Sequence, residues 1–421
     1  MKVAFYTLGC KLNQAETESL VAQFSGSGFQ VVAPDDVADV CIANTCTVTH
    51  VADRKSRHWL RLARRRNPQA LVIAAGCYAR RCPEELADLA DLVVDNAEKE
   101  NLLDLVQTLS LEGREPGEGG AKQSQVPALS ARTRSLIKIQ DGCHGPCTYC
   151  IVPRVRPYEY SLPASQIIDG VKQKVALGYK EVVLTGTKVG SYKDGGADLG
   201  GLLRHILGET NVERLHLSSL QPSEISAEFL ALWKDERLCR HFHLALQSGS
   251  DGVLRRMRRR YSLDQYAEAM GLIGENVPDA AITTDVIVGF PGESDDEFEQ
   301  SHSFCRQAGF ANIHVFPFSP RPETAAERMP GQVGQRTKRE RTRRMLELSR
   351  NCRRSFCERF LEQTIPVLWE KESSPGSGIY SGLTGNYIRV FASSEEPVSN
   401  KITPVRLLEF HDRGILGEII R

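Results

Sequence analysis

The feature that most constrains this chain is a regular alternation of short apolar runs with helical segments. Residues 3–8, 38–43 and 70–75 are such runs, and helical patterns separate them. Residues 111–133 are instead rich in Gly, Pro, Ser and charge, which is typical of a linker. Apolar strands that alternate with helices form parallel sheets with covered faces. The part before the linker is therefore predicted to be a doubly wound parallel α/β domain.

The alternation resumes after the linker. The strand candidates there are residues 135–139, 181–185, 213–218, 242–246, 282–288 and 312–316. This series predicts an open, partial (βα)6 barrel rather than a complete eight-fold one. From residue 365 onward, short β-type runs broken by Gly, Ser and Pro predict a small five-stranded β-barrel of the oligonucleotide-binding type. The predicted organisation is a domain at 1–110, a linker at 111–133, a partial barrel at 134–358 and a β-barrel at 359–421.

Composition places the chain among ordinary globular proteins. It has 421 residues, of which 41% are hydrophobic and 25% are charged. The start, MKVAFYTLGC, is typical of a strand rather than a signal peptide, and no stretch has the length and apolarity of a membrane helix. A cytoplasmic protein is therefore expected. In that reducing compartment the 12 cysteines would serve metals or catalysis more often than disulfides.

A cysteine triplet directly after the first barrel strand is the sharpest chemical signal. Cys143, Cys147 and Cys150 have the spacing C-x3-C-x2-C. Three thiolates on one loop can hold three irons of a [4Fe–4S] cluster and leave the fourth iron open. S-adenosylmethionine (SAM) can bind an open iron through its amino and carboxylate groups. A zinc site completed by His144 is the alternative, although zinc sites more often use C-x2-C pairs.

Three further cysteines each follow a predicted strand of the first domain. Cys10, Cys46 and Cys77 end the runs TLGC, ANTC and AAGC. Because the carboxyl ends of parallel strands lie along one edge of a sheet, these thiols should converge on a second cluster with an open iron. A four-cysteine metal site that pairs Cys41 and Cys46 with Cys77 and Cys82 is the alternative. Cys41 lies inside a strand, however, where cysteine packs as an apolar residue.

The order of these motifs resembles the methylthiotransferase family of radical SAM enzymes over essentially the whole chain. The run at 44–57 (NTCTVTHVADRKSR), Gly-Cys-Tyr at 76–78 and Gln-Ser-Gly-Ser at 247–250 are similar to the branch acting on N6-threonylcarbamoyladenosine in transfer RNA. The segment 151–163 departs from the family pattern, with Pro157 where a glycine is usual. The resemblance implies SAM contacts from loops at strand ends, with the candidates Thr185, Gly186, Gln247, Ser248, Gly289, Pro291 and Gly292.

The resemblance also implies the chemistry. The six cysteines would be catalytic, holding two [4Fe–4S] clusters. One SAM would methylate a sulfur held on the cluster of Cys10, Cys46 and Cys77. A second SAM, bound at the other cluster, would yield a 5′-deoxyadenosyl radical that takes hydrogen from C2 of the adenine, where the methylthio group then attaches. The implied partners are transfer RNA, an electron donor such as flavodoxin or ferredoxin, and a sulfur donor, with no membrane.

Other substrates and another class of protein remain open at this point. Relatives act on N6-isopentenyladenosine or on an aspartate of a ribosomal protein. A non-catalytic iron–sulfur regulator that binds RNA is the interpretation outside the enzymes. The C-terminal module resembles a TRAM domain, which is an RNA-binding barrel. A basic helix predicted over about 51–66, after Cys46, favours RNA over a protein loop as the substrate.

Three basic runs stand out in a chain whose formal net charge is zero. They cover residues 54–66, 255–260 and 336–354. Clustered Lys and Arg beside an RNA-binding module favour contacts to phosphates. Arg64, Arg65 and Arg66 are the RNA-binding candidates, and a solvated helix face is the alternative interpretation.

Overall fold

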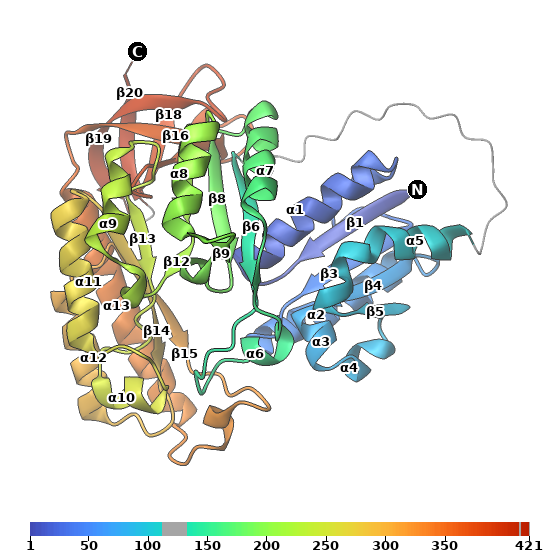
Figure 1. The fold of residues 1–421 in the computed structure, drawn as a ribbon, viewed down its shortest axis with the longest axis horizontal. Helices are drawn as coiled ribbons and strands as arrows, with labels where there is room; N and C mark the ends of the chain where they lie inside the picture. Colours follow the sequence, from blue (N-terminus) through green and yellow to red (C-terminus); the bar gives the residue numbers. More distant parts are fainter. Residues whose placement is uncertain (112–132, 412–413, 421) are drawn as a thin grey trace.

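Residues 1–111, 133–411 and 414–420 are described by the computed structural model, which has a mixed α/β architecture (Figure 1). Parallel strands form the N-terminal and central parts, and a closed β-barrel lies at the C-terminal end. The predicted linker at 111–133 falls outside the described residues except for its two end positions. No described helix is both long and apolar enough to cross a membrane.

The N-terminal strands form a parallel sheet in the order β2-β1-β3-β4-β5. These strands are β1 (Lys2–Thr7), β2 (Gln30–Val32), β3 (Val40–Thr45), β4 (Leu71–Gly76) and β5 (Leu92–Val94). The helical segments are α1 (Lys11–Gly26), α2 (His50–Arg66), α3 (Cys77–Arg81), α4 (Glu84–Ala87), the 3-10 turn η1 (Asn96–Asn101) and α5 (Leu102–Leu111). One apolar cluster packs α1 and α5 onto one face of the sheet, and another packs α2 and α3 onto the opposite face.

Local sequence explains how α2 follows β3. All residues of β3 are buried, as expected for a central strand with both faces covered. The Thr49 hydroxyl then accepts a hydrogen bond from the N–H of Ala52 and caps α2. Asp53 lies in the first turn and three arginines lie in the last turn, which matches the direction of the helix dipole. The helix predicted from the basic run is therefore confirmed.

Asn13 with Glu16 has the spacing of a capping box, which predicts a helix that begins there, but α1 starts earlier. The helix begins at Lys11, and Cys10 is its N-cap residue without a side-chain capping bond. The Asn13 amide instead donates to the carbonyl oxygens of Leu8 and Thr45, at 2.8 and 3.1 Å. Both Asn13 and Glu16 thus bind groups outside the helix, which local sequence could not indicate. A helix expected near 84–91 is likewise shorter, since α4 covers only Glu84–Ala87.

Six parallel strands at the predicted positions form the central part. They are β6 (Arg134–Asp141), β8 (Glu181–Gly186), β11 (Arg214–Leu217), β13 (His241–Leu244), β14 (Ala281–Val288) and β15 (Asn312–Pro317). Two short strands extend these sheets: β7 (Tyr160–Ser161) pairs antiparallel with β6, and β12 (Ser219–Leu220) pairs parallel with β13. A separate two-stranded sheet is formed by β9 (Lys193–Asp194) and β10 (Ala197–Asp198). The pairing orders β11-β8-β6-β7 and β12-β13-β14-β15, with a bridge from Leu215 to Leu238, describe a partial barrel.

Helices surround these strands on the outer side (Figure 1). They are α7 (Ala164–Ala176), α8 (Leu199–Glu209), α9 (Ala227–Leu230), α10 (Asp251–Arg256), α11 (Leu263–Asn276), α12 (Asp295–Gln307) and α13 (Gln335–Glu358). The short helix α6 (Val152–Val155) instead packs against α3 of the N-terminal part. Shorter 3-10 turns are η2 (Val189–Ser191), η3 (Pro222–Glu224), η4 (Ala231–Lys234) and η5 (Ala325–Arg328). The largest apolar cluster of the described residues lies between these helices and the strands.

The C-terminal part is a closed five-stranded barrel in the order β16-β17-β18-β20-β19, which confirms the predicted β module. Its strands are β16 (Thr364–Glu372), β17 (Ile379–Thr384), β18 (Arg389–Ser393), β19 (Ile402–His411) and β20 (Gly414–Ile419). Arg214 at the start of β11 donates to the carbonyl oxygens of Pro366 and Leu383. At the other side of the central part, α1 packs against β6 and β8. Both neighbouring parts therefore contact the partial barrel directly.

Candidate functional site

The predicted cysteine triplet lies on one loop after β6. Backbone contacts fix this loop: the N–H of Gly145 donates to Cys143 Sγ at 3.2 Å, and the N–H of Cys150 donates to the carbonyl of Cys147 at 3.1 Å. Gly142 precedes it with a φ of +76°, and a Cβ there would lie 1.9 Å from the carbonyl oxygen of Tyr158. The turn therefore requires glycine. The structure gathers the three thiols as the spacing predicted.

Electrostatics in the triplet suit a bound metal group. Burial raises the pKa of Cys150 to about 12, and Cys147 and Cys143 add to the shift. Burial also raises the pKa of Cys143. Three thiolates this close repel one another unless a cation lies among them, and thiolates are the ligands that iron–sulfur clusters use. The donor set therefore fits a cluster bound through three cysteines.

His144 does not complete a zinc site in this arrangement. Its Nε2 lies 2.6 Å from the carbonyl oxygen of Pro157, and its Nδ1 faces Glu159 at 3.6 Å. Both ring nitrogens are thus directed to groups other than the thiols. Arg259 is the side chain that approaches the triplet, with Nη1 3.4 Å from Cys147 Sγ. Its guanidinium also stacks on the Tyr261 ring and places a positive charge beside the thiolates.

The second cysteine triad gathers at the carboxyl edge of the N-terminal sheet. Cys10 precedes α1, Cys46 follows β3, and Cys77 is the first residue of α3 after β4. Burial raises the pKa of Cys46 to about 12, and the Cys77 and Cys10 thiols add to it. Gly9 allows this approach: with φ +103°, its added Cβ would lie 2.9 Å from Cys46 Sγ. The three thiols again form a set that fits an iron–sulfur cluster.

The two other cysteines weighed for this site lie elsewhere. Cys41 is buried inside β3, and the charges that act on it are Arg64, Arg66 and Asp39 rather than cysteines. Cys82 follows the end of α3, and Glu85 lies beside it. Burial raises the pKa of both thiols to about 11. The four-cysteine alternative therefore does not describe this arrangement.

The two cysteine sets are joined by a contact between Cys77 and residues that follow the triplet. Cys77 packs against Ile151 and Val155, which directly follow the triplet. Asn96 joins the two sides, since its amide nitrogen lies 3.6 Å from Cys77 Sγ and 2.7 Å from the carbonyl oxygen of Val155. The sites of two predicted clusters thus border the same interface between the N-terminal sheet and the partial barrel.

A buried network of charges holds that interface together. Arg156 donates to Asn13 at 2.9 Å, to Glu16 at 2.7 Å and to Asp141 at 2.7 Å, so it joins α1 to the end of β6. Burial acts to raise the pKa of Glu16, but Lys99 and Arg156 hold it well below the ordinary range. Because a buried charge left without a partner is strongly destabilising, this network fixes how the two parts meet.

The candidate SAM loops lie at the carboxyl ends of strands, on the same edge as the triplet. Thr185 and Gly186 end β8, and a Cβ on Gly186 would lie 2.8 Å from the carbonyl oxygen of Gln140. Gln247 has a φ of +69° and donates its N–H to the carbonyl of Asp285 at 2.8 Å. Ser248 is fully buried, and its hydroxyl pairs with Ser301 at 3.0 Å.

The loop after β14 is shaped by glycines at positive φ. Gly289 and Gly292 both have φ of +73°, and an added Cβ on Gly289 would lie 2.5 Å from Lys338 Cγ. The N–H of Gly292 donates to the carbonyl of Gly331 at 2.8 Å, and Pro291 lies between the two glycines. These backbone contacts show that the candidate residues shape the loops. That these residues contact SAM stays a prediction.

The basic runs are less uniform than their sequence indicates. Arg64 is paired with Asp91 at 2.5 Å, and Arg66 is paired with Asp35 at 2.9 Å, whereas Arg65 is exposed. Arg259, from the second run, faces the cysteine triplet. In the third run Arg341 is buried against Glu293 and Asp295, and Lys338 is also buried. Several basic side chains therefore serve internal contacts.

Sequence reasoning missed Asn96, Arg156 and Arg259 as neighbours of the cysteines. Both arginines lie close after motifs that were recognised. Arg156 looked like an ordinary surface residue in sequence, and Arg259 belonged to a basic run interpreted as a candidate RNA surface. Lys11 could have been selected from the sequence as a candidate site residue, because it is a charged residue directly after the candidate ligand Cys10. Asp285 also interrupts the apolar strand TTDVIVG, which indicates a polar group in the barrel interior.

Comparison with known proteins matches both α/β parts of the chain. The family model of the radical SAM superfamily matches residues 137–305, and that of the uncharacterized protein family UPF0004 matches residues 2–95. Among solved structures, the radical SAM methyltransferase TsrM from Kitasatospora setae has a TM-score of 0.59 at 14% identity, over 77% of each chain. This likeness concerns the fold alone. Together, the partial barrel, its cysteine triplet and the first family model define an enzyme of the radical SAM class.

Relatives of full length give the family. Threonylcarbamoyladenosine tRNA methylthiotransferase MtaB of Bacillus subtilis (strain 168) is 35% identical over 97% of this chain and 94% of that protein. The protein of the same name from Aquifex aeolicus (strain VF5) is 39% identical over 93% and 96%. The tRNA-2-methylthio-N(6)-dimethylallyladenosine synthase of Syntrophotalea carbinolica is 32% identical over 99% of each. The chain belongs to the methylthiotransferase family of radical SAM enzymes.

Proposed function

We propose that this protein converts N6-threonylcarbamoyladenosine next to the anticodon of transfer RNA into its 2-methylthio derivative. The observation that carries the proposal is the pair of cysteine triads that meet across Asn96, Ile151 and Val155. Reactions that join two cofactor-bound groups need both held close to one substrate atom. The names of the relatives from Bacillus subtilis and Aquifex aeolicus support the choice of substrate.

Each cluster is assigned its own ligands. Cys143, Cys147 and Cys150 hold the cluster that binds SAM, and Cys10, Cys46 and Cys77 hold the auxiliary cluster. When bound, the clusters and SAM supply the radical and sulfur-transfer chemistry. Arg259 places its charge beside Cys147. The hydrogen bonds of Arg156 hold the two cluster sites in a fixed relative position. The loops with Thr185, Gly186, Gln247, Ser248, Gly289, Pro291 and Gly292 form the walls for SAM.

The rest of the chain is proposed to serve RNA binding and supply. The assigned units are a doubly wound domain at 1–110, a linker at 111–133, the radical SAM barrel at 134–358 and a TRAM-like module at 359–421. The last unit binds transfer RNA together with Arg65 and its neighbours Arg64 and Arg66. The protein works in the cytoplasm, where flavodoxin or ferredoxin supplies electrons and a separate protein or sulfide supplies sulfur.

Nucleoside mass spectrometry tests the proposed function. Anaerobically reconstituted protein is incubated with SAM, a reductant, sulfide and transfer RNA that carries N6-threonylcarbamoyladenosine. The transfer RNA is then digested to nucleosides, and their masses are measured. A mass increase for one methylthio group in place of hydrogen on that nucleoside is expected. Parallel transfer RNA with N6-dimethylallyladenosine serves as the comparison. Methylthiolation of the dimethylallyl substrate alone would assign the other branch, and 5′-deoxyadenosine without a modified nucleoside would contradict both.

A further inference from the structure

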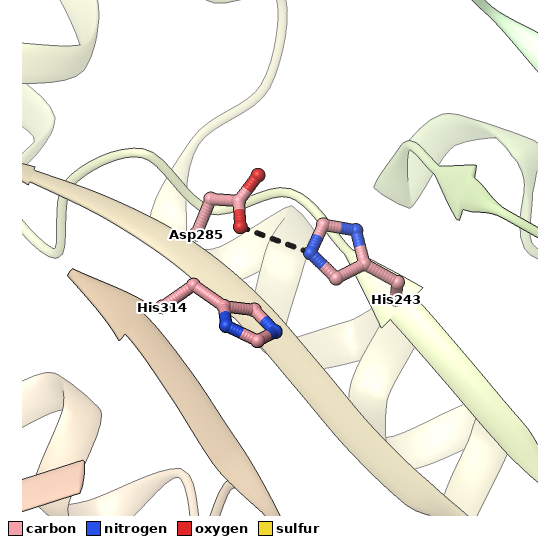
Figure 2. Close-up of side chains that lie close together, drawn as sticks. All are labelled: His243, Asp285 and His314. Atoms are coloured by element: carbon pink, nitrogen blue, oxygen red, sulfur yellow. Dashed lines mark hydrogen bonds and ion pairs between the residues drawn. The ribbon is translucent and has the colours of Figure 1, made fainter. Parts of the chain in front are cut away.

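A cluster of polar side chains lies inside the partial barrel, where the cysteines do not reach. His243, Asp285 and His314 come from the neighbouring strands β13, β14 and β15 and point toward one another (Figure 2). The register explains this, because Asp285 pairs with His314 and Thr283 pairs with His243 along the strands. One potential ligand atom from each residue lies within 4.8 Å of the others. Polar groups gathered inside a barrel mark a binding site rather than a packed core.

A second layer of polar residues, nearer the C-terminal barrel, behaves differently. The Tyr387 hydroxyl bonds with Glu181 and His216, and His216 Nε2 lies 2.7 Å from His241 Nδ1. His241 Nε2 continues the chain to Thr283 at 2.9 Å. All members of this layer are buried or nearly so, and hydrogen bonds link them in one chain that leaves only Oε2 of Glu181 without a partner among the described residues. This layer is structural, and it closes one end of the barrel interior.

The layer of His243, Asp285 and His314 is not satisfied in this way. His243 Nε2 pairs with Asp285 at 3.1 Å, but the buried Nδ1 of His243 has no hydrogen-bond partner among the described residues. His314 is exposed, and no described residue makes a hydrogen bond or an ion pair with it. Buried polar atoms in folded proteins are nearly always paired. The unpaired, buried Nδ1 of His243 therefore indicates that this layer faces a ligand.

The charge of Lys11, the first residue of α1, reaches the same interior. Its charge acts on one residue of each of six central strands, namely Arg134, Glu181, His216, His241, Asp285 and His314. A side chain can be near all six strands only from inside the partial barrel. No described residue makes a hydrogen bond or an ion pair with Lys11, and part of the residue is open to solvent. Burial by the surrounding protein nevertheless lowers the pKa of its ammonium group, and the charge of Arg134 adds to this shift. Lys11 also directly follows Cys10, so the cation lies next to the auxiliary cysteine triad.

The charge in this interior favours an anion over a metal ion. His243, Asp285 and His314 resemble a set of metal ligands, and the Asp285 carboxylate by itself favours a cation. The ammonium group of Lys11 offsets that charge and repels a metal ion. Burial lowers the pKa of His314, and Asp285 opposes this shift. His243 and Lys11 act in the same direction as burial, so His314 is a neutral imidazole that can donate one hydrogen bond. One lysine and one imidazole donor are suited to a carboxylate.

We propose that Lys11 and His314 form the site that binds the carboxylate of the threonylcarbamoyl group. This proposal rests on the proposed function and names the part of the substrate that is recognised. The dimethylallyl group carries no charge, so the same site would give that substrate no ion pair. His243 and Asp285 position the donors around the bound carboxylate. A site built for a charged group rejects an analogue that lacks the charge, because its own polar atoms are then left unpaired.

The test compares two RNA substrates with several variants of the full, two-cluster protein. One anticodon stem-loop carries the threonylcarbamoyl group as the free acid, and the other carries it as the primary amide. The parent should prefer the acid by about 10- to 100-fold in kcat/KM, the range for a hydrogen-bonded charge. Lys11→Met should lose this factor on the acid and show a ratio of acid to amide near one. Lys180→Met, which removes a surface ion pair with Glu213, is the control and should keep the ratio of the parent.

Further measurements distinguish carboxylate binding from damage to the adjacent cluster, from a metal site and from failure of the proposed function. Iron content and 5′-deoxyadenosine formation show whether Lys11→Met disturbs the cluster beside it. Should it do so, His314→Phe, which is remote from the cysteines in sequence, should reduce the ratio about 5-fold. An unchanged ratio in both variants, or a parent that treats acid and amide alike, would overturn the proposal. Stoichiometric zinc that is lost in His243→Ala would overturn it in favour of a metal site. A parent that never modifies the acid substrate would instead contradict the proposed function.

Discussion

The two cysteine sets of this protein are built in opposite ways. Cys143, Cys147 and Cys150 lie within eight residues on one loop, so the chain itself keeps their thiols together. Cys10, Cys46 and Cys77 are spread over nearly seventy residues and meet only because β1, β3 and β4 are parallel neighbours. The first site is therefore encoded locally, and the second depends on a folded sheet. The two sites should accordingly respond differently to substitution.

The largest effect is expected from removing the local site. Replacing Cys143, Cys147 and Cys150 together by Ala should abolish SAM cleavage and lower bound iron from about eight to about four per chain. Chromatography of 5′-deoxyadenosine and an iron assay on reconstituted protein measure this. Cys352→Ala, in α13, is the matched control and should change neither value. Full iron in the triple variant would show that these cysteines do not hold a cluster.

Weakening the N-terminal sheet should reveal the non-local character of the other site. Ile42 is fully buried in β3, and Ile42→Ala should cost about 2–5 kcal/mol in the free energy of unfolding. The loss should lower iron at the strand-end triad while SAM cleavage persists. Leu203→Ala in α8 removes a similar buried side chain beside the barrel and should spare the strand-end triad. Equal loss of both clusters in Ile42→Ala would contradict the difference between the sites.

A smaller effect should follow from crowding one ligand of the strand-end triad. Gly9→Ala adds a Cβ within 2.9 Å of Cys46 Sγ at a φ of +103°, so strain and collision act together. Gly28→Ala has the same backbone problem, with φ +86°, but meets no atom within 4 Å. Each backbone strain costs about 1–3 kcal/mol. Iron titration should show weaker iron binding for Gly9→Ala than for Gly28→Ala. Identical iron binding in both variants would show that the collision with Cys46 has no effect.

The smallest effect is expected at the basic helix α2. Arg65 is exposed, whereas Arg64 and Arg66 are held by Asp91 and Asp35. Arg65→Gln should flatten the slope of log affinity for transfer RNA against log salt by about 0.9, the value for one lost phosphate contact. Arg64→Gln should change the slope less. Fluorescence anisotropy over a series of salt concentrations measures both, and an unchanged slope for Arg65→Gln would leave α2 as a solvated face.

The same comparison shows which parts of the fold and the site could be predicted from sequence. The spacing of Cys143, Cys147 and Cys150 is local, so the sequence pattern alone predicted that their thiols lie together. Cys10 and Cys46 could be placed together because strand ends of a parallel sheet share an edge. The alternation of strands and helices likewise predicted the six central strands and the final β-barrel, both of which the structure contains.

What the sequence could not predict depends on how the parts meet. Arg156 looked like one more surface arginine, yet it is buried between α1 and the end of β6 because Asn13 and Glu16 turn toward it. Arg259 belonged to a run read as a candidate RNA surface, but its guanidinium faces Cys147. Lys11 acquires its place in the barrel interior only when α1 packs against β6 and β8. These positions follow from tertiary contacts, which periodicity and spacing do not contain.

The central claim is that the two cysteine sets hold two clusters with separate tasks, and Cys46→Ala tests it most directly. The variant is reconstituted anaerobically and supplied with SAM, reductant and transfer RNA that carries N6-threonylcarbamoyladenosine. Formation of 5′-deoxyadenosine and of the methylthiolated nucleoside is then measured in the same reaction. The account predicts that Cys46→Ala still cleaves SAM but forms no methylthiolated nucleoside. Methylthiolation at the rate of the parent, or loss of SAM cleavage while the cluster of Cys143, Cys147 and Cys150 remains bound, would contradict it.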